Sequence, residues 1–414
     1  MNGCIGGAPG PWRARVLALS GPADLSAEMA RVGADPAGIA IMQPKARLRL
    51  VKLDAVPRWA ANILKQEMLA IGGEAAVSRQ AMFGGAGATD CLLMGTLAHY
   101  QCLGEKLNAQ PLGLALAGAE IQRALLAFDG PLATELRCGE DTLRLGQRTL
   151  VMGIINATSD SFSGDGLAGD VGAMIERGEQ MAAEGADLLD VGGESTRPGA
   201  QTVDAETEIA RVLPVIDGLR RRVSTPISID TYKAKVARAA LDAGAAVIND
   251  ISGLRADAGM APLAAERGAP VIVMHMRGTP RTMQDNPHYD DLMGEIAAYL
   301  RDSVDLAERA GVPRGQVVID PGFGFGKTVQ HNLEILRRLR ELRSLGQPVL
   351  LGPSRKSSIG KVLDLPAEER LEGTLAVLSL AIANGADIVR VHDVRPAVRV
   401  ARMADAVVRG WDGP

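Results

Sequence analysis

The sequence predicts a (β/α)8 TIM barrel preceded by a smaller α/β domain. From about residue 150, short β-branched apolar segments alternate with segments of helical length, the pattern of parallel strands joined by helices. Eight such strand-helix units fill about 260 residues, close to the roughly 250 that this barrel needs. Nearly every predicted strand ends on a polar residue, and barrel enzymes build their sites from those ends.

The eight predicted strands share short runs of Val, Ile or Leu bounded by polar residues. They are Val151–Ala157, Leu188–Gly192, Pro226–Thr231, Ala246–Ile251, Val271–His275, Val317–Asp320, Pro348–Gly352 and Ile388–His392. Segments such as Asp290–Ala310 and Leu333–Leu345 are the expected helices between them. A doubly wound open sheet is the alternative architecture. It usually concentrates its site at one switch point, so polar residues at all eight strand ends favour the closed barrel.

The N-terminal residues 13–145 predict a separate α/β domain, followed by the barrel over residues 146–414. The N-terminal domain is expected to contain helices at Trp59–Ile71, Thr96–Leu107 and Ala119–Phe128 and short strands at Arg47–Leu53 and Cys91–Met94. Residues 1–12 are rich in Gly and Pro and are expected to be disordered. This domain contains no catalytic motif, and we expect it to serve oligomerisation or to stabilise loops of the barrel.

Composition excludes several classes of function. A net charge of −4 and an aromatic content of 3% argue against a nucleic-acid-binding surface. No run approaches the roughly 18 apolar residues of a membrane span, and the first residues lack the pattern of an export signal. Four cysteines without a C-x-x-C pair indicate neither a zinc knuckle nor a disulfide framework. We expect a soluble cytoplasmic protein that acts on small molecules.

The polar residues at the strand ends form the candidate site. They are Asn156, Asp190, Asp230, Asn249, His275, Asp320, the run Ser354-Arg355-Lys356, Arg390 and His392. Asp230, Asn249 and Asp320 end apolar strands, where buried polar groups must find partners. Together they could read the donors and acceptors of a flat heterocycle. The alternative is that each pairs internally with a neighbouring strand or loop.

An anion site is expected after the seventh and eighth strands, where phosphate sites of barrels recur. Ser354-Arg355-Lys356-Ser357 stands where a helix begins, and Arg390 and His392 lie on the same side of their strand. The five histidines lack the spacing of a catalytic zinc site. Asn156 together with phosphate oxygens suits Mg2+ better.

Three loops are candidates to cover a substrate. The segments 156–166 and 190–199 are rich in hydroxyl, carboxylate and Gly residues, and ordinary solvated turns are the alternative explanation. The segment Gly322–Thr328 resembles a phosphate loop, but Pro321 stands where that motif requires Gly. We therefore expect a glycine-shaped barrel loop in which Phe325 covers an aromatic substrate.

Residues from about 148 to 409 resemble dihydropteroate synthase, an enzyme family of the folate pathway. The segments that carry the resemblance are Met152–Gly166, Asp190–Gly199, Ser228–Thr231, Ile248–Ile251, Met274–Gln284, Asp320–Lys327, Ser354–Ile359 and Arg390–Asp393. The resemblance implies that 6-hydroxymethyl-7,8-dihydropterin pyrophosphate and p-aminobenzoate give 7,8-dihydropteroate and pyrophosphate. It also implies Mg2+ as cofactor, a homodimer, and binding of the pterin before the arylamine.

The resemblance also implies a role for each matching residue. Asp230, Asn249, Met274, Asp320 and Lys356 would hold the pterin. Asn156, Arg390 and His392 would bind the pyrophosphate, with Asn156 as the metal ligand. The p-aminobenzoate pocket would consist of Phe162, Thr196, Arg197, Pro198, Phe325 and Ser357. Asp320, Lys356, Arg390 and His392 would be the catalytic residues.

The sequence departs from the family pattern in the first loop and at the N-terminus. Ser159 replaces the usual Pro after Thr158, and the order Gly164-Asp165 shifts the second Asp of the loop. The N-terminal domain is absent from the compact family pattern.

Three other functions compete with the synthase. They are a pterin-dependent methyltransferase acting on a corrinoid partner, a Schiff-base aldolase built on Lys356, and a non-catalytic pterin-binding protein. The methyltransferase has no need of an anion site after strands seven and eight. Release of pyrophosphate separates it from the synthase.

Overall fold

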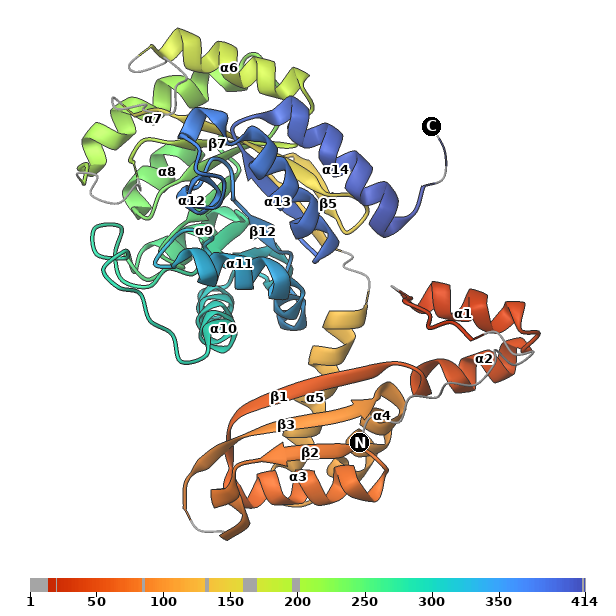
Figure 1. Cartoon of the computed structure of the whole chain (residues 1–414). Coiled ribbons are helices and arrows are strands. Elements are labelled where there is room, and N and C mark those ends of the chain that lie inside the picture. Colours follow the sequence, from red (N-terminus) through yellow and green to blue (C-terminus); the bar gives the residue numbers. More distant parts are fainter. Residues whose placement is uncertain are drawn as a thin grey trace. The chain divides into compact units, whose positions relative to one another are not determined.

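The computed structural model describes residues 14–19, 21–83, 86–130, 134–158, 170–195, 202–411 and 413. The chain forms two compact units, Met1–Arg123 and Ala124–Pro414 (Figure 1). Residues 1–12, for which we expect disorder, lie outside the described residues. Within the described ranges, no helix is both long enough and apolar enough to cross a lipid bilayer.

The first unit contains a three-stranded antiparallel sheet in the order β1-β3-β2. Its strands are β1 (Leu48–Pro57), β2 (Glu74–Val77) and β3 (Ala88–Thr96). Its helices are α1 (Pro22–Arg31), α2 (Pro36–Met42), α3 (Arg58–Ala70), α4 (Leu97–Asn108) and the first part of α5 (Leu114–Asp129). The helices and strands expected here are therefore present, whereas β2, α1 and α2 were not foreseen because their short segments lack a clear apolar period.

One face of this sheet is buried against α3 and α4. Leu64 and Met68 of α3, Leu93 of β3 and Tyr100 of α4 are almost completely buried. The Tyr100 hydroxyl lies within hydrogen-bond distance of the carbonyl oxygens of Arg49 (3.0 Å) and Leu93 (2.9 Å), so the buried phenol has polar partners on both strands. These contacts give the first unit a core of its own.

The second unit is an eight-stranded parallel barrel in the order β11-β10-β9-β8-β7-β6-β13-β12. Its strands are β6 (Leu150–Asn156), β7 (Leu188–Gly192), β8 (Ile227–Asp230), β9 (Val247–Asp250), β10 (Val271–Met274), β11 (Val317–Asp320), β12 (Leu350–Leu351) and β13 (Ile388–Val391). A parallel bridge pairs Ile319 of β11, the first strand in this order, with Val349, the residue directly before β12, the last one. The predicted barrel is confirmed, with the seventh strand shorter than expected.

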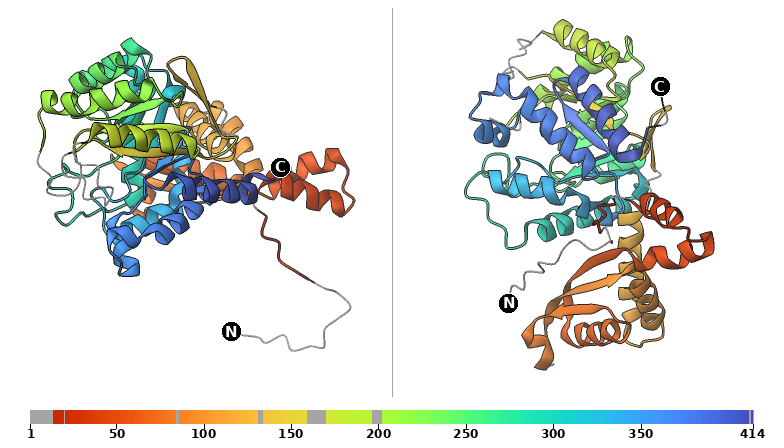
Figure 2. Two further views of the ribbon diagram at one scale, coloured as in Figure 1. Left: turned by 90° about the horizontal axis from the view of Figure 1, so that it is seen from above. Right: turned by 45° about the vertical axis from the view of Figure 1, so that its right-hand side comes forward.

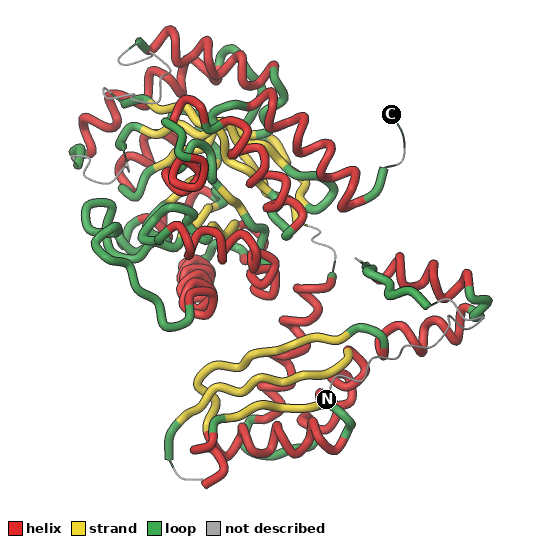
Figure 3. The backbone as a smooth tube through the Cα atoms, viewed as in Figure 1, coloured by secondary structure: helices red, strands yellow, loops and turns green. Residues whose placement is uncertain are grey.

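Helices enclose the barrel strands (Figures 2 and 3). They are α6 (Val171–Ala183), α7 (Ala205–Arg220), α8 (Ala234–Asp242), α9 (Met260–Arg267), α10 (Leu292–Ala310), α11 (Val329–Arg338), α12 (Ser357–Leu363), α13 (Leu371–Ala383) and α14 (Val394–Arg409). Local signals set their ends. The Asp291 side chain accepts from the Gly294 N–H at the start of α10, and Gly311 ends that helix in the left-handed conformation.

A hairpin packs with residues at the beginnings of the barrel strands. β4 (Thr134–Cys138) pairs with β5 (Asp141–Leu145), and the pair belongs to the second unit. Buried residues of the hairpin share one cluster with buried strand residues: Leu136, Cys138, Leu145, Leu150, Met152, Leu188, Val247, Ile272, Val318, Leu350 and Ile388. The compact units therefore divide earlier in the chain than the expected boundary at residue 145, because this hairpin contributes to the core of the barrel.

We expect removal of the hairpin to destabilise the barrel. A variant that begins at residue 146 loses Leu136, Cys138 and Leu145, whereas a variant that begins at Ala124 keeps them. Loss of these buried side chains should lower the free energy of unfolding by about 5 kcal/mol, at roughly 1.5–3 kcal/mol each. Urea unfolding of the two shortened proteins measures the difference. Equal midpoints and equal slopes would show that the hairpin adds nothing to the core.

Candidate active site

The register of the barrel brings the predicted site residues to one level. Asn156 pairs with Gly192, Gly192 with Asp230, and Asp230 with Asn249 across β6 to β9. Met274 pairs with Asp320 across β10 and β11. Because the strands are parallel, these residues all lie at the carboxyl ends, where barrel enzymes assemble their sites.

Arg390 links the carboxylates on one side of this mouth. Its Nε lies 2.6 Å from Asp190 Oδ2, and its Nη2 lies 2.7 Å from Asp230 Oδ2. Asn249 Nδ2 donates to the same Asp190 oxygen at 3.0 Å. Arg390 is also the predicted pyrophosphate contact, and the structure places two of its three guanidinium nitrogens against carboxylates. The planar fork of arginine is suited to this double contact.

Asp190 was predicted to lie at the mouth of the barrel, but no role was assigned to it from the sequence. Its side chain is fully buried, and no hydrogen-bond partner for Oδ1 is found among the described residues. A buried acceptor without a partner is energetically unfavourable. The signal that could have found it was the position of Asp190 inside the apolar run of its strand, which predicted burial.

Burial strongly perturbs the other two carboxyl groups. It raises the pKa of Asp230 to about 7, with the nearby Arg390 acting in the opposite direction. Burial also raises the pKa of Asp320 to about 6, although the Gly322 N–H and the cations Lys356 and Lys327 favour its charged form. Buried carboxyl groups with a pKa raised toward neutral pH are typical of functional sites.

The glycine-rich loop after β11 lies directly against the strand ends. The Gly322 N–H donates to Asp320 Oδ1 at 2.7 Å. Gly322 has a φ of +70°, and a Cβ atom there would lie 1.9 Å from the His275 carbonyl oxygen. Only glycine permits this conformation and this approach. The loop is therefore shaped by its glycines, as the sequence indicated.

Lys356 lies against Phe325 of this loop. The Lys356 Nζ lies 4.1 Å from the centroid of the Phe325 ring, which is a cation-π distance. Lys356 immediately precedes α12, and Ser357 is the first residue of that helix and is exposed. The predicted pterin contact Lys356 and the predicted arylamine contact Phe325 are thus brought together.

Hydrogen bonds tie the loops after β12 and β13 to each other. The Ser354 hydroxyl lies 3.0 Å from His392 Nδ1 and accepts from the His392 backbone N–H at 3.2 Å. Arg355 forms an ion pair with Asp393 at 2.8 Å. His392 is therefore held against the loop after β12, and Arg355 is paired with the residue that follows His392.

Several predicted residues lie outside the described residues. They are Phe162, Thr196, Arg197 and Pro198 of the predicted p-aminobenzoate pocket and Ser159, Gly164 and Asp165 of the first loop. Asn156, the predicted metal ligand, is described and is partly buried at the end of β6. Among the described residues, no group of three or more His, Cys, Asp or Glu side chains could hold a metal ion.

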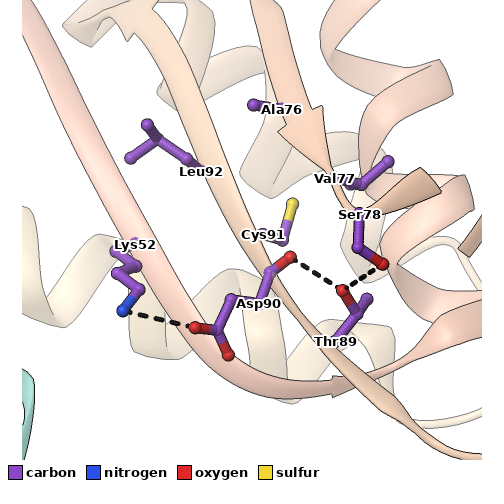
Figure 4. A pocket seen from close by; sticks show the side chains of 8 residues that line it. All are labelled: Lys52, Ala76, Val77, Ser78, Thr89, Asp90, Cys91 and Leu92. Carbon is purple, nitrogen blue, oxygen red and sulfur yellow. Dashed lines mark hydrogen bonds and ion pairs between the residues drawn. The ribbon is translucent and has the colours of Figure 1, made fainter. Parts of the chain in front are cut away.

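The first unit has a separate open pocket of about 380 Å3 (Figure 4). It is lined by Lys52, Ala76, Val77, Ser78, Thr89, Asp90, Cys91 and Leu92. Lys52 and Asp90 form an ion pair at 3.3 Å, and the Thr89 hydroxyl bonds to that of Ser78 at 2.8 Å. Since burial raises the pKa of the Cys91 thiol to about 11, this cysteine is a poor nucleophile. None of the predicted site residues lies in this pocket.

Comparisons with known proteins identify the family of the barrel. Residues 152–392 match the family described as pterin binding enzyme. A dihydropteroate synthase from Synechocystis is 48% identical over 275 residues, which are 66% of this chain and 95% of that relative. A solved dihydropteroate synthase from Xanthomonas albilineans, in complex with 7,8-dihydropteroate, is 41% identical, with a TM-score of 0.59 over 66% of this chain and 98% of that one.

The chain therefore belongs to the pterin-binding enzymes. Within them it belongs to the dihydropteroate synthases, which are transferases of folate biosynthesis.

Some relatives also match beyond the barrel. A probable bifunctional folylpolyglutamate synthase/dihydropteroate synthase from Halobacterium salinarum is 42% identical over 92% of this chain, which spans 46% of that relative. Because the barrel unit begins only at Ala124, a match of this length extends into the first unit.

Proposed function

We propose that this protein joins 6-hydroxymethyl-7,8-dihydropterin pyrophosphate to p-aminobenzoate and releases pyrophosphate. The single observation that supports this best is the linked set of side chains at the mouth of the barrel, where Arg390 contacts Asp190 and Asp230, Asn249 contacts Asp190, and β11 ends on Asp320. A flat heterocycle with ring N–H groups, an amine and a carbonyl requires several acceptors and donors in one small space. This set of side chains provides them.

The pterin would bind against Asp230, Asn249 and Asp320, with Lys356 at its carbonyl and Met274 against its face. Asp320 in its charged form is a strong acceptor for the N–H groups of the ring. The second oxygen of Asp190 is a further acceptor, which the ligand could satisfy. We therefore add Asp190 to the pterin contacts that the resemblance implies.

The reaction itself breaks the bond between the pterin methylene and the pyrophosphate oxygen. We propose that this bond breaks first, so that the methylene becomes cationic and the leaving oxygens become more negative. Arg390 and His392 would stabilise the departing charge, and the buried carboxylates would stabilise the cationic pterin. The arylamine nitrogen then attacks the methylene carbon and loses a proton, which completes the transfer.

We propose that a magnesium ion binds here together with the pyrophosphate. Mg2+ is commonly held by one or two protein oxygens together with substrate phosphates and water. The Asn156 amide at the end of β6 could supply one such oxygen. When bound, the ion would neutralise charge on the leaving group. The proposed arylamine pocket consists of Phe162, Thr196, Arg197, Pro198, Phe325 and Ser357. The protein is expected to be a cytoplasmic homodimer.

The proposal is tested by mixing the pure protein with Mg2+, the dihydropterin pyrophosphate and p-aminobenzoate and following pyrophosphate release. We expect release to depend on both substrates and to be lost in Lys356→Ala. Pterin binding without release would instead favour a methyltransferase or a non-catalytic pterin-binding protein.

The first unit is proposed to support assembly or the loops of the barrel. A variant that begins at Ala124 tests this idea, because it keeps the hairpin in the barrel core. We expect it to lose activity or to change its assembly state, as measured by turnover and light scattering. Unchanged turnover in an unchanged assembly would contradict both roles.

A further inference from the structure

Lys327 is a buried cation for which the proposed reaction has no role so far. It belongs to the glycine-rich loop Gly322–Thr328, and only 3% of the residue is exposed. Its Nζ lies 2.9 Å from His275 Nδ1, 2.9 Å from the Phe325 carbonyl oxygen and 3.5 Å from the His275 carbonyl oxygen. An ammonium group has three N–H donors and no acceptor. Three acceptors around the nitrogen therefore match the charged form of Lys327 beside a neutral His275.

The balance of charge at the barrel mouth also favours a charged Lys327. Three carboxylates, those of Asp190, Asp230 and Asp320, interact with three cations, those of Arg390, Lys356 and Lys327. The two ion pairs of Arg390 join it to Asp190 and Asp230. The Asp320 carboxylate accepts from the Gly322 N–H at 2.7 Å, and the His275 backbone N–H donates to the Asp320 carbonyl oxygen at 2.9 Å, so Asp320 is bonded to the residue that Lys327 contacts. Lys356 and Lys327 both favour the charged form of Asp320. Lys356 is proposed to contact the substrate, which leaves Lys327 as the cation behind the site.

We propose that Lys327 is a positioning residue of the pterin site, whose buried ammonium keeps Asp320 in its carboxylate form and whose hydrogen bonds hold the backbone of Phe325. This inference rests on the proposed function and deepens it. Without a nearby cation, burial favours the neutral acid. A protonated Asp320 would present one O–H donor in place of an acceptor, and its remaining acceptor would be uncharged. Recognition of the ring N–H groups would then be weaker.

Other charged and titratable groups surround this pair and set its pH dependence. They are His275, Arg255, Arg277, Tyr289, Tyr299, His331, Lys356 and Arg390. Burial, aided by Lys327, lowers the pKa of His275 to about 2, so this histidine stays neutral. Burial lowers the pKa of Lys327 to about 7, and Asp320 acts in the opposite direction. The two partners therefore support each other's charge near neutral pH.

The test compares Lys327→Gln, which keeps a donor but removes the charge, with Lys327→Arg, which keeps the charge. The ionisation of Asp320 is followed by 13C NMR of the protein labelled at Asp, with the signal assigned by its loss in Asp320→Asn. We expect Lys327→Gln to raise the pKa of Asp320 by about one or more, the size of effect that one nearby opposite charge produces. Lys327→Arg should stay close to the wild-type value.

The same variants are compared in turnover. We expect the acid limb of kcat/KM for the dihydropterin pyrophosphate to move to higher pH in Lys327→Gln by the same amount as the NMR titration. Activity should fall about tenfold at pH 5, because raising the pKa of an acid by about one leaves roughly a tenth as much carboxylate at a pH below that pKa. The KM for p-aminobenzoate should change less.

Lys361→Met, which alters an exposed lysine on α12, is the matched control and should behave as wild type.

An unchanged Asp320 titration in Lys327→Gln would overturn the inference. Equal losses of kcat/KM in Lys327→Gln and Lys327→Arg at every pH would also overturn it. The second outcome would indicate a purely structural lysine. If Lys327→Gln does not fold, Lys327→Met is the second neutral variant, and the Asp320 titration in Lys327→Arg still has to match wild type. Since the NMR titration needs no substrate, it remains decisive even if the wild-type protein releases no pyrophosphate.

Discussion

Replacing Asp320 by Asn is expected to lower kcat/KM for the dihydropterin pyrophosphate about a hundredfold and, at the same time, to stabilise the folded protein. The loss follows because a neutral amide replaces a charged acceptor and presents a donor to the ring N–H groups of the substrate. An unpaired buried polar group and a lost charge-assisted hydrogen bond together cost about 3 kcal/mol, which corresponds to a factor of about a hundred. Steady-state kinetics with varied pterin substrate measures this effect.

The gain in stability follows from the buried charge. Burial raises the pKa of Asp320 to about 6, above the value of about 3.9 expected in the unfolded chain. The folded state therefore binds this proton more tightly, and stability is lost as pH rises toward and through the folded pKa. At pH 8 the ionised group costs about 3 kcal/mol, and Asn at this position avoids that cost. Urea unfolding at pH 5 and pH 8 measures the difference.

A matched control for this change is Asp302→Asn, since Asp302 is exposed on α10. It should alter neither kcat/KM nor the dependence of unfolding on pH. Wild-type kcat/KM in Asp320→Asn would remove Asp320 from the pterin site. A variant less stable than wild type at pH 8 would mean that the carboxylate is stabilised in the folded state, contrary to our interpretation.

Replacing Arg390 by Met is expected to lower both turnover and stability. The guanidinium is within 2.7 Å of both Asp190 and Asp230, so its loss leaves two buried carboxyl groups without their common counter-charge. Breaking a buried ion pair in this way typically costs roughly 3–5 kcal/mol, so we expect a loss of about 4 kcal/mol at pH 8. Turnover should fall about a thousandfold, because a cation that stabilises the leaving group is also lost.

The stability loss in Arg390→Met should depend on pH. The pKa of Asp230 is already raised to about 7 with Arg390 present, and without it the neutral acid is favoured further. The loss should therefore be smaller at pH 5, where Asp230 is protonated, than at pH 8. Arg390→Lys should recover part of the stability but little turnover, because an ammonium lacks the planar fork. Arg395→Lys, an exposed arginine on α14, is the control, and equal effects at both positions would contradict the assignment.

The barrel and most of its site could be predicted from the sequence because both depend on local patterns. Each strand is a short apolar run, and the polar residues at the ends of these runs predicted Asp230, Asn249 and Asp320 at the mouth, whereas Met274 followed only from the family resemblance. A parallel sheet brings all carboxyl ends to one edge whatever the detail of the packing. The fold class and the level of the site therefore followed from sequence alone.

The partners of the charged residues were decided only by the tertiary structure. Arg390 is 200 residues from Asp190 and 160 from Asp230 along the chain, and no local pattern pairs them. The same holds for Lys327, which sequence reasoning read only as part of a failed phosphate motif and which reaches His275 across 52 residues. The hairpin β4–β5 was missed as part of the barrel because its two short strands precede the repeating pattern.

The sequence by itself thus determined the class of fold, the end of the barrel that carries the site, and the chemical groups available there. The tertiary structure decided which of these groups neutralise one another and which keep an unsatisfied oxygen, as Asp190 does among the described residues. The physical reason is that apolar periodicity is a local property of the chain, whereas burial, ion pairing and the resulting pKa values arise only when distant strands meet.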